Sequence, residues 1–210
     1  MKEYIYIKTK HIYIYIYKKK MLKFKLSIQF LILSIIFVII SNGMTIKRKN
    51  ELKEKVEEMI FHAFNGYMNY AFPSDELHPL ACDGKDRDFE NENNYGVNDI
   101  LGNYTLTLID SLDTLAIIGD KKAFENAVNK VIHTVNFDID SQVSTFESNI
   151  RILGGLLAGH LFAINDDYGV KLDNYNDELL NLAYDLGKRL LPAFYNSTSE
   201  IPLNKVNYLS

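Results

Sequence analysis

The sequence contains no tryptophan, and it has one cysteine, four prolines and 11 glycines among 210 residues. A single cysteine excludes a framework of disulfides within the chain. The low proline and glycine content excludes a collagen-like or linker composition. Hydrophobic residues make up 47% of the chain and charged residues 24%, which excludes a disordered protein. The net charge is −4, so we expect no nucleic-acid partner, since such proteins usually present a basic face.

Charge is distributed unevenly along the chain. Residues 1–43 contain eight lysines and one acid, which leaves 15 basic and 26 acidic residues, a net charge of −11, in residues 44–210. The lysines precede an uncharged apolar run, LSIQFLILSIIFVII, at 26–40. This run is short for a membrane span of about 20 residues, and it is typical of a secretory signal peptide. The alternative is an uncleaved membrane anchor. Both predict that residues 44–210 form a separate domain in the secretory lumen.

Residues 1–20 are a low-complexity leader in which tyrosine and isoleucine alternate. The alternation has the period of a strand. We interpret the leader instead as sequence upstream of a true start at Met21, from which a compact signal peptide would begin. Two sequons for N-glycosylation, at Asn103 and Asn196, agree with a luminal protein.

Residues 45–195 show apolar residues every three or four positions and no alternating strand pattern, which predicts an all-α fold of consecutive helical hairpins. Pro73 and Gly119 mark the ends of the first two helices, and Pro192 stops the last. The helices are expected at 49–71, 101–118, 120–135, 145–161 and 174–191. Asp120 is the expected N-cap of the third helix, and Ser144 and Glu147 form an expected capping box at the fourth. Residues 74–98 are expected to form a long polar loop.

The usual soluble-enzyme motifs are missing from the sequence. The histidines show no metal-ligand spacing, and there is no HExxH, CxxC, P-loop, GxGxxG or GxSxG pattern. What remains is a small number of acids among apolar residues. Asp110 and Asp113 lie in the segment LTLIDSLDTLAII, three residues apart and therefore on one face of the expected helix. They are either structural acids that join helix ends or part of a polar pocket wall.

Glu147 and Arg151 form a second charged pair, four residues apart in the order that favours a helical ion pair. They are interpreted either as a capping box with a surface salt bridge, or as a glycosidase acid beside an arginine. A glycosidase acid must be protonated near the departing oxygen. A neighbouring arginine favours the ionised form instead, so the arginine's alternative role is to bind a sugar hydroxyl.

Three blocks, LGNYTLTLIDSLDTLAIIGD, VSTFESNIRILGGLLAGH and NDELLNLAYDLGKRLLPAF, resemble the class I α-1,2-mannosidases of glycoside hydrolase family 47. The stretch HAFNGYMNYAFPSDELHPLACDG is similar to the branch of endoplasmic-reticulum degradation-enhancing α-mannosidase-like proteins. The resemblance implies an (α/α) barrel, a calcium ion at its base and inverting hydrolysis of α-1,2-linked mannose. It further implies high-mannose N-glycans on misfolded glycoproteins as partners, in the lumen or membrane of the endoplasmic reticulum.

The same resemblance assigns roles to individual residues. Glu147 matches the acid that protonates the leaving group, and Arg151 matches a sugar-contacting arginine. Asp110 and Asp113 match family acids of the pocket or the structure. Cys82 matches a cysteine whose partner lies far downstream in the family. In this chain we expect it to form mixed disulfides with a luminal oxidoreductase.

The remaining catalytic carboxylates and the calcium-binding threonine of the family have no match among these residues. An inverting mechanism needs a second carboxylate to activate water. We therefore expect an inactive N-terminal portion of the barrel, with no metal ligands of its own. The alternative is a non-catalytic module that binds glycans or misfolded clients. The final segment IPLNKVNYLS departs from the family pattern, and we interpret its last residues as foreign sequence.

Overall fold

The computed structural model describes residues 20–21, 25, 28–34, 43–199 and 201–209. The expected leader and most of the expected signal segment lie outside these residues, although 28–34 are helical. No helix in the described part of the chain is both long and apolar enough to cross a membrane. The chain divides into two compact units, 1–55 and 56–210, and the second contains all the candidate site residues.

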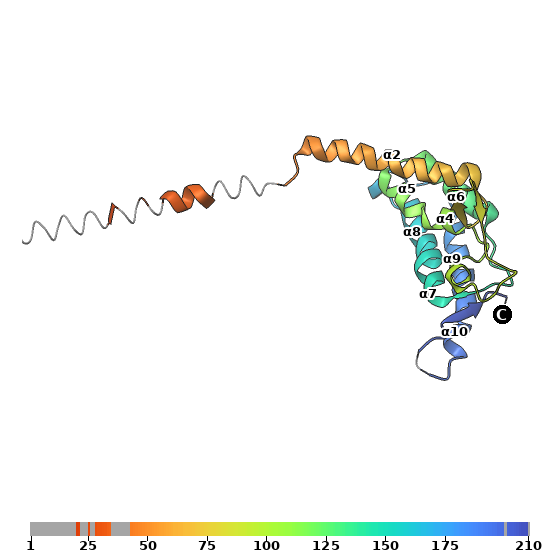
Figure 1. Ribbon diagram of the computed structural model, residues 1–210. Helices are drawn as coiled ribbons and strands as arrows, with labels where there is room; N and C mark the ends of the chain where they lie inside the picture. The colour runs from red at the N-terminus through yellow and green to blue at the C-terminus, as the bar shows by residue number, and fades with distance from the viewer. Residues whose placement is uncertain (1–19, 22–24, 26–27, 35–42, 200, 210) are drawn as a thin grey trace, which may run out of the picture. The chain divides into compact units, whose positions relative to one another are not determined.

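Helices make up most of the described structure, which confirms the all-α class (Figure 1). The α-helices are α2 (Ile46–Tyr70), α3 (Tyr95–Asn98), α4 (Leu106–Asp110), α5 (Leu112–Ile118), α6 (Lys121–Thr134), α7 (Thr145–Glu147), α8 (Gly154–Ile164), α9 (Glu178–Leu190) and α10 (Pro192–Tyr195). A π-helix, η1 (Ser148–Leu153), joins α7 to α8, and a 3₁₀ turn, η2 (Asp166–Tyr168), follows α8. The path from α7 through η1 to α8 is continuous, because the residues at both junctions have helical dihedrals.

Short strands within 45–195 correct the expectation of a body without strands, and two of them lie in the long polar loop expected at 74–98. Strands β1 (Glu76–His78) and β2 (Asp83–Lys85) form an antiparallel pair within that expected loop. Strands β3 (Gln142–Ser144) and β4 (Lys205–Asn207) form a second antiparallel pair. Each strand has three residues, too few to show the alternation by which sequence patterns identify strands.

The core lies where α8 packs against both α5 and α9, while α6 packs against the same two helices. Each of these helices turns an apolar face inward, as the spacing of three and four predicted. These faces contain fully buried large side chains, among them Leu112, Leu115, Phe124, Leu156 and Leu186. The turn between α5 and α6 is as predicted from the sequence. Gly119 ends α5 with a φ of 84°, and the Asp120 side chain caps α6 by accepting the Ala123 N–H.

The helix expected at 101–118 begins later and is broken. Its first residues are held out of the helix by Asp75, whose fully buried carboxylate accepts the backbone N–H groups of Asn103, Tyr104 and Leu106. Thr105 has a φ of 58°, a left-handed value that is rare for a β-branched residue, and α4 begins only after it. A second break at Ser111 separates α4 from α5.

The C-terminal part of the chain belongs to the fold, which corrects our interpretation of its last residues as foreign. Val206 and Tyr208 are buried, and the Tyr208 ring packs 5.9 Å from the rings of both Tyr104 and Phe137. The last expected helix begins at Glu178 rather than near 174, and Pro192 opens the short helix α10 after α9 ends.

Candidate functional site

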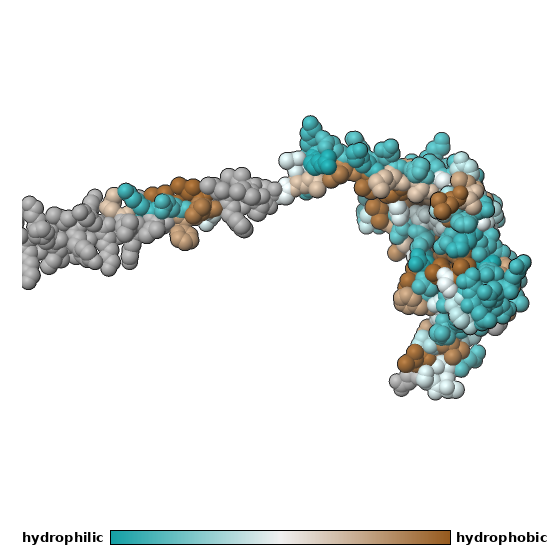
Figure 2. Space-filling view, viewed as in Figure 1, coloured by the Kyte–Doolittle hydropathy of each residue, from teal (hydrophilic) through white to brown (hydrophobic). Residues whose placement is uncertain are grey.

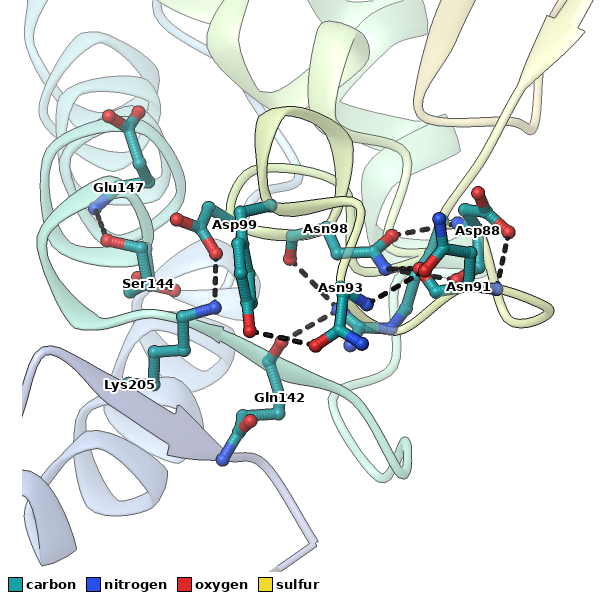
Figure 3. A network of polar contacts seen from close by, with 12 residues as sticks. Asp88, Asn91, Asn93, Asn98, Asp99, Gln142, Ser144, Glu147 and Lys205 are labelled. Atoms are coloured by element: carbon teal, nitrogen blue, oxygen red, sulfur yellow. Dashed lines mark hydrogen bonds and ion pairs between the residues drawn. The ribbon is translucent and has the colours of Figure 1, made fainter.

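Glu147 lies at the end of α7, where one half of the expected capping box forms. The Ser144 hydroxyl accepts the Glu147 N–H at 3.3 Å (Figure 3). The other half is not made, because the Ser144 N–H donates to the Asp99 carbonyl at 3.0 Å instead. The helix start is therefore capped without using the Glu147 carboxylate, which remains available for other partners.

Arg151 is the partner of that carboxylate. Its Nε lies 2.7 Å from a Glu147 oxygen, and its Nη1 lies 3.1 Å from an Asp110 oxygen. The three side chains are partly exposed, at 39% for Arg151, 23% for Glu147 and 42% for Asp110. Hydrogen bonding to Glu147, with a smaller contribution from Asp110, raises the pKa of Arg151 above its ordinary value. One cation thus joins two carboxylates at a surface that solvent reaches.

The contact with Asp110 depends on a close approach between helices. A Cβ atom at Gly155 would lie 2.9 Å from the carbonyl oxygen of Ile109, so only glycine allows the backbones to come this close. Ile109 is the neighbour of Asp110 in α4, and Gly155 follows Arg151 by about one helical turn. The crossing therefore brings the Arg151 guanidinium to the end of α4. A π-helical turn at Ser148–Leu153 is a feature often found at functional sites.

Asp113 does not join this cluster, although sequence spacing placed it on one face with Asp110. The break at Ser111 puts the two acids in different helices. The Ser111 hydroxyl donates to the Thr107 carbonyl at 2.5 Å, and Asp113 accepts a hydrogen bond from the Thr114 hydroxyl at 3.3 Å. Asp110 is thus placed with Arg151, while Asp113 has a local partner.

An ion pair that the sequence did not indicate stands beside the Glu147 turn. Lys205 of β4 has its Nζ 2.6 Å from Asp99 (Figure 3). The same Nζ lies 4.2 Å from the centre of the Tyr95 ring. The Asp99 carbonyl is the group that accepts the Ser144 N–H. Asp99 and Lys205 lie far apart in the sequence, so no local pattern could have paired them.

The loop before Asp99 is ordered by its own polar groups. Asp88 accepts hydrogen bonds from the Asn94 side chain and from the N–H groups of Asn91 and Glu90, and these lower its pKa (Figure 3). Arg87 donates from Nη1 to the carbonyls of Asn98 at 2.9 Å and Gln142 at 2.7 Å. The loop is thereby attached to β3, which leads directly to Glu147.

The remaining predicted residues lie away from this cluster. Asn103 is exposed, but Thr105 of its sequon is buried and its hydroxyl has no hydrogen-bond partner among the described residues. Asn196 is exposed after α10. Cys82 is exposed and is not in a disulfide. Within the described residues, no three His, Cys, Asp or Glu side chains are grouped closely enough to hold a metal ion, so we assign calcium to none of them.

Chemically, the cluster offers a carboxylate and a guanidinium on adjacent turns of one helix. A carboxyl group can donate or accept a proton, and a guanidinium can donate several hydrogen bonds to hydroxyl groups. The fixed fork geometry of arginine gives such contacts a defined direction. A carboxyl group and a guanidinium placed in this way are the groups expected in one wall of a site that binds and protonates a polar, oxygen-rich ligand.

Comparison with known proteins identifies the family of the chain. The family model described as glycosyl hydrolase family 47 matches residues 59–210. The "ER degradation-enhancing alpha-mannosidase-like protein 1" of Schizosaccharomyces pombe is 51% identical over 162 residues, covering 77% of this chain and 20% of that protein. The human "ER degradation-enhancing alpha-mannosidase-like protein 3" is 50% identical over 165 residues, covering 78% of this chain and 18% of that protein. The chain thus spans about a fifth of the length of these curated relatives.

A solved structure shows the same fold. The alpha-1,2-mannosidase from Trichoderma reesei superposes with a TM-score of 0.60 at 25% sequence identity, covering 73% of this chain and 30% of that one. The fold is therefore part of the (α/α) barrel that the resemblance implied. The family match includes every residue of the Glu147, Arg151 and Asp110 cluster. The chain belongs to glycosyl hydrolase family 47.

Proposed function

We propose that residues 44–210 form one wall of an α-mannosidase-like site that acts on high-mannose N-glycans of misfolded glycoproteins in the endoplasmic reticulum. The observation that supports this most directly is the ion pair between Glu147 and Arg151, which is partly exposed and independent of the helix cap. The membership in family 47 and the names of the relatives support the substrate class and the compartment.

In this proposal Glu147 supplies the proton to the departing sugar oxygen. Such an acid must hold a proton while the glycosidic bond breaks. Arg151 now pairs with the Glu147 carboxylate, and a sugar hydroxyl that binds the guanidinium competes with this contact. Asp110 remains as a second partner that keeps Arg151 in place.

We further propose that these 210 residues do not hydrolyse glycans alone. An inverting glycosidase needs a second carboxylate, which activates water from the opposite side of the sugar ring. Asp110, the other carboxylate in this cluster, is held in an ion pair with the same arginine as Glu147. A water-activating role is therefore assigned to no residue of the described cluster.

The decisive experiment measures both binding and hydrolysis with a high-mannose N-glycan. The full chain should bind the glycan and release no mannose, and Glu147→Gln and Arg151→Ala should each weaken binding. Arg48→Ala is the matched control, because Arg48 also forms an ion pair with a nearby glutamate, Glu51, on the exposed face of α2. Absence of binding by the wild-type chain contradicts the proposed site. Mannose release that depends on Glu147 contradicts the proposed inactivity.

A second function, a non-catalytic module for misfolded clients, is favoured by apolar side chains at the surface. The stretch from α7 through α8 exposes Phe146, Ile150 and Leu161, and hydrophobic patches are visible between hydrophilic residues in Figure 2. Exposed apolar patches of this kind are typical of surfaces that bind other proteins. Binding of an unfolded, non-glycosylated polypeptide as tight as that of its glycosylated form would favour this function over glycan recognition.

A further inference from the structure

The C-terminal segment holds the turn that carries Glu147. The Thr145 N–H donates to the Asn204 carbonyl at 2.9 Å, and the Thr145 hydroxyl donates to the Leu203 carbonyl at 2.8 Å. Ser144 of β3 lies opposite Lys205 of β4 in the antiparallel pair. The backbone just before Glu147 is therefore fixed to residues about 60 positions later in the chain.

Tyr208 extends this attachment to the other side of Glu147. Its hydroxyl donates to the Ser148 hydroxyl at 2.6 Å, and the Ser148 hydroxyl donates to the Ser144 carbonyl at 2.8 Å. Tyr208 and Ser148 are both fully buried. The chain of hydrogen bonds therefore joins the residues on either side of the Glu147 turn, and a fully satisfied buried network of this kind is rigid.

Tyr208 is itself held firmly. Its ring packs against the rings of Tyr104 and Phe137, and its backbone carbonyl accepts a hydrogen bond from Arg189 of α9 at 2.7 Å. Burial raises the pKa of the Tyr208 hydroxyl, so the group stays a neutral donor at physiological pH. Because Tyr208 is fixed at its ring and its backbone, the hydrogen bond from its hydroxyl also fixes the position of Ser148.

We propose that Tyr208 is a positioning residue for the Glu147–Arg151 pair, acting through Ser148 to fix the turn from which both side chains project. A role of this positioning in glycan binding rests on the proposed function. Its role in holding the Glu147–Arg151 ion pair does not. Loss of the Tyr208 hydroxyl leaves Ser148 without its donor and loosens the start of η1. The 2.7 Å contact between Arg151 and Glu147 then becomes less persistent.

The test compares Tyr208→Phe with Tyr104→Phe in the full chain. Tyr104 is a matched control, because it is also buried, contacts the Tyr208 ring and donates its own hydroxyl to the Ile100 carbonyl rather than to Ser148. The readout is the rate at which the Arg151 Nε–H exchanges with solvent, measured by NMR, together with the thermal stability of each variant. Exchange should accelerate severalfold in Tyr208→Phe and stay unchanged in Tyr104→Phe, even where both variants lose similar stability.

A second variant, Ser148→Ala, tests the same chain of hydrogen bonds should Tyr208→Phe fail to fold. It should accelerate Arg151 exchange as Tyr208→Phe does, and the double variant should add little, since both act through one contact. Unchanged exchange in the variants that fold overturns the positioning role. A parallel titration with a high-mannose N-glycan separates the two ideas: accelerated exchange without glycan binding by the wild type retains the positioning role and contradicts the proposed function.

Discussion

The Nε atom of Arg151 lies 2.7 Å from the carboxylate of Glu147, while Nη1 of the same guanidinium lies 3.1 Å from Asp110. The arginine therefore bridges the start of one helical segment and the end of another. A lysine in this place would keep the charge but not the fork of donors that reaches both carboxylates. The arrangement thus depends on the identity of the side chain as well as on its charge.

Replacing Arg151 by lysine should weaken binding of a high-mannose N-glycan about tenfold, the effect of losing about 1.4 kcal/mol from a charge-assisted contact. Stability should fall by less than about 1 kcal/mol, because the ion pairs are partly exposed and screened by solvent. Calorimetric titration and urea unfolding measure the two quantities, with Arg48→Lys as the control. A variant that binds as the wild type does would show that the fork is not used.

The helix crossing can be tested at Gly155. An added Cβ would lie 2.9 Å from the Ile109 carbonyl, so Gly155→Ala should push α8 from α4 and lower the free energy of unfolding by about 1–3 kcal/mol. Gly154→Ala is the control, because its Cβ would meet its nearest neighbour at an ordinary 3.5 Å. Urea unfolding of both variants checks the prediction. Equal stability of the two would mean that the crossing tolerates a methyl group.

Local spacing predicted the parts of the site that neighbours in sequence build. The interval of four residues identified the Glu147–Arg151 pair, and Gly119 followed by Asp120 identified the turn between α5 and α6. These features depend on short-range helical geometry, which can be predicted from the spacing of residues in the sequence. The pairing of Arg151 with Asp110 was beyond such reasoning, because it requires the close crossing at Gly155.

Long-range polar contacts explain where the helix predictions were wrong. The apolar pattern continues from Leu101 towards Ile118, but the buried Asp75 carboxylate accepts three backbone N–H groups, the last of them from Leu106, and delays the start of α4. Periodicity indicates which face of a helix is apolar. It contains no information about a side chain nearly 30 residues earlier that accepts the backbone N–H groups of the helix start. The same limit concealed Asp99 and Lys205, which meet only in the folded chain.

The two sequons should differ in their use. Asn196 and Thr198 are exposed, whereas the stretch from Asn103 to Thr105 is fixed by Asp75 and the Thr105 hydroxyl is buried. When the chain is made in a eukaryotic secretory pathway, we expect higher glycan occupancy at Asn196 than at Asn103. Mass spectrometry of glycopeptides measures both. Equal occupancy would show that modification is complete before the Asp75 contacts form.

Asp75 should be among the acids whose loss destabilises the fold most. It is fully buried and accepts three backbone N–H groups. In Asp75→Asn the amide NH₂ faces these donors and leaves at least one of them unpaired, which should cost at least about 2 kcal/mol. Urea unfolding measures the loss. Asp88→Asn is the control, since Asp88 also accepts backbone N–H groups but from an exposed loop, and its replacement should change stability little.

The stability contributed by Asp75 should also depend on pH in an unusual direction. Burial raises its pKa above the ordinary 3.8, against the opposing effect of the hydrogen bonds from Leu106, Asn103 and Tyr104. Between 3.8 and the raised pKa, the folded chain binds this proton and the unfolded chain does not. Lowering the pH through that window therefore adds to the free energy of unfolding, and Asp75→Asn lacks this gain. The difference between wild type and variant, measured by urea unfolding at a series of pH values, should grow on acidification from neutral pH. A difference that shrinks would mean that the three N–H donors outweigh burial and hold the pKa below its ordinary value.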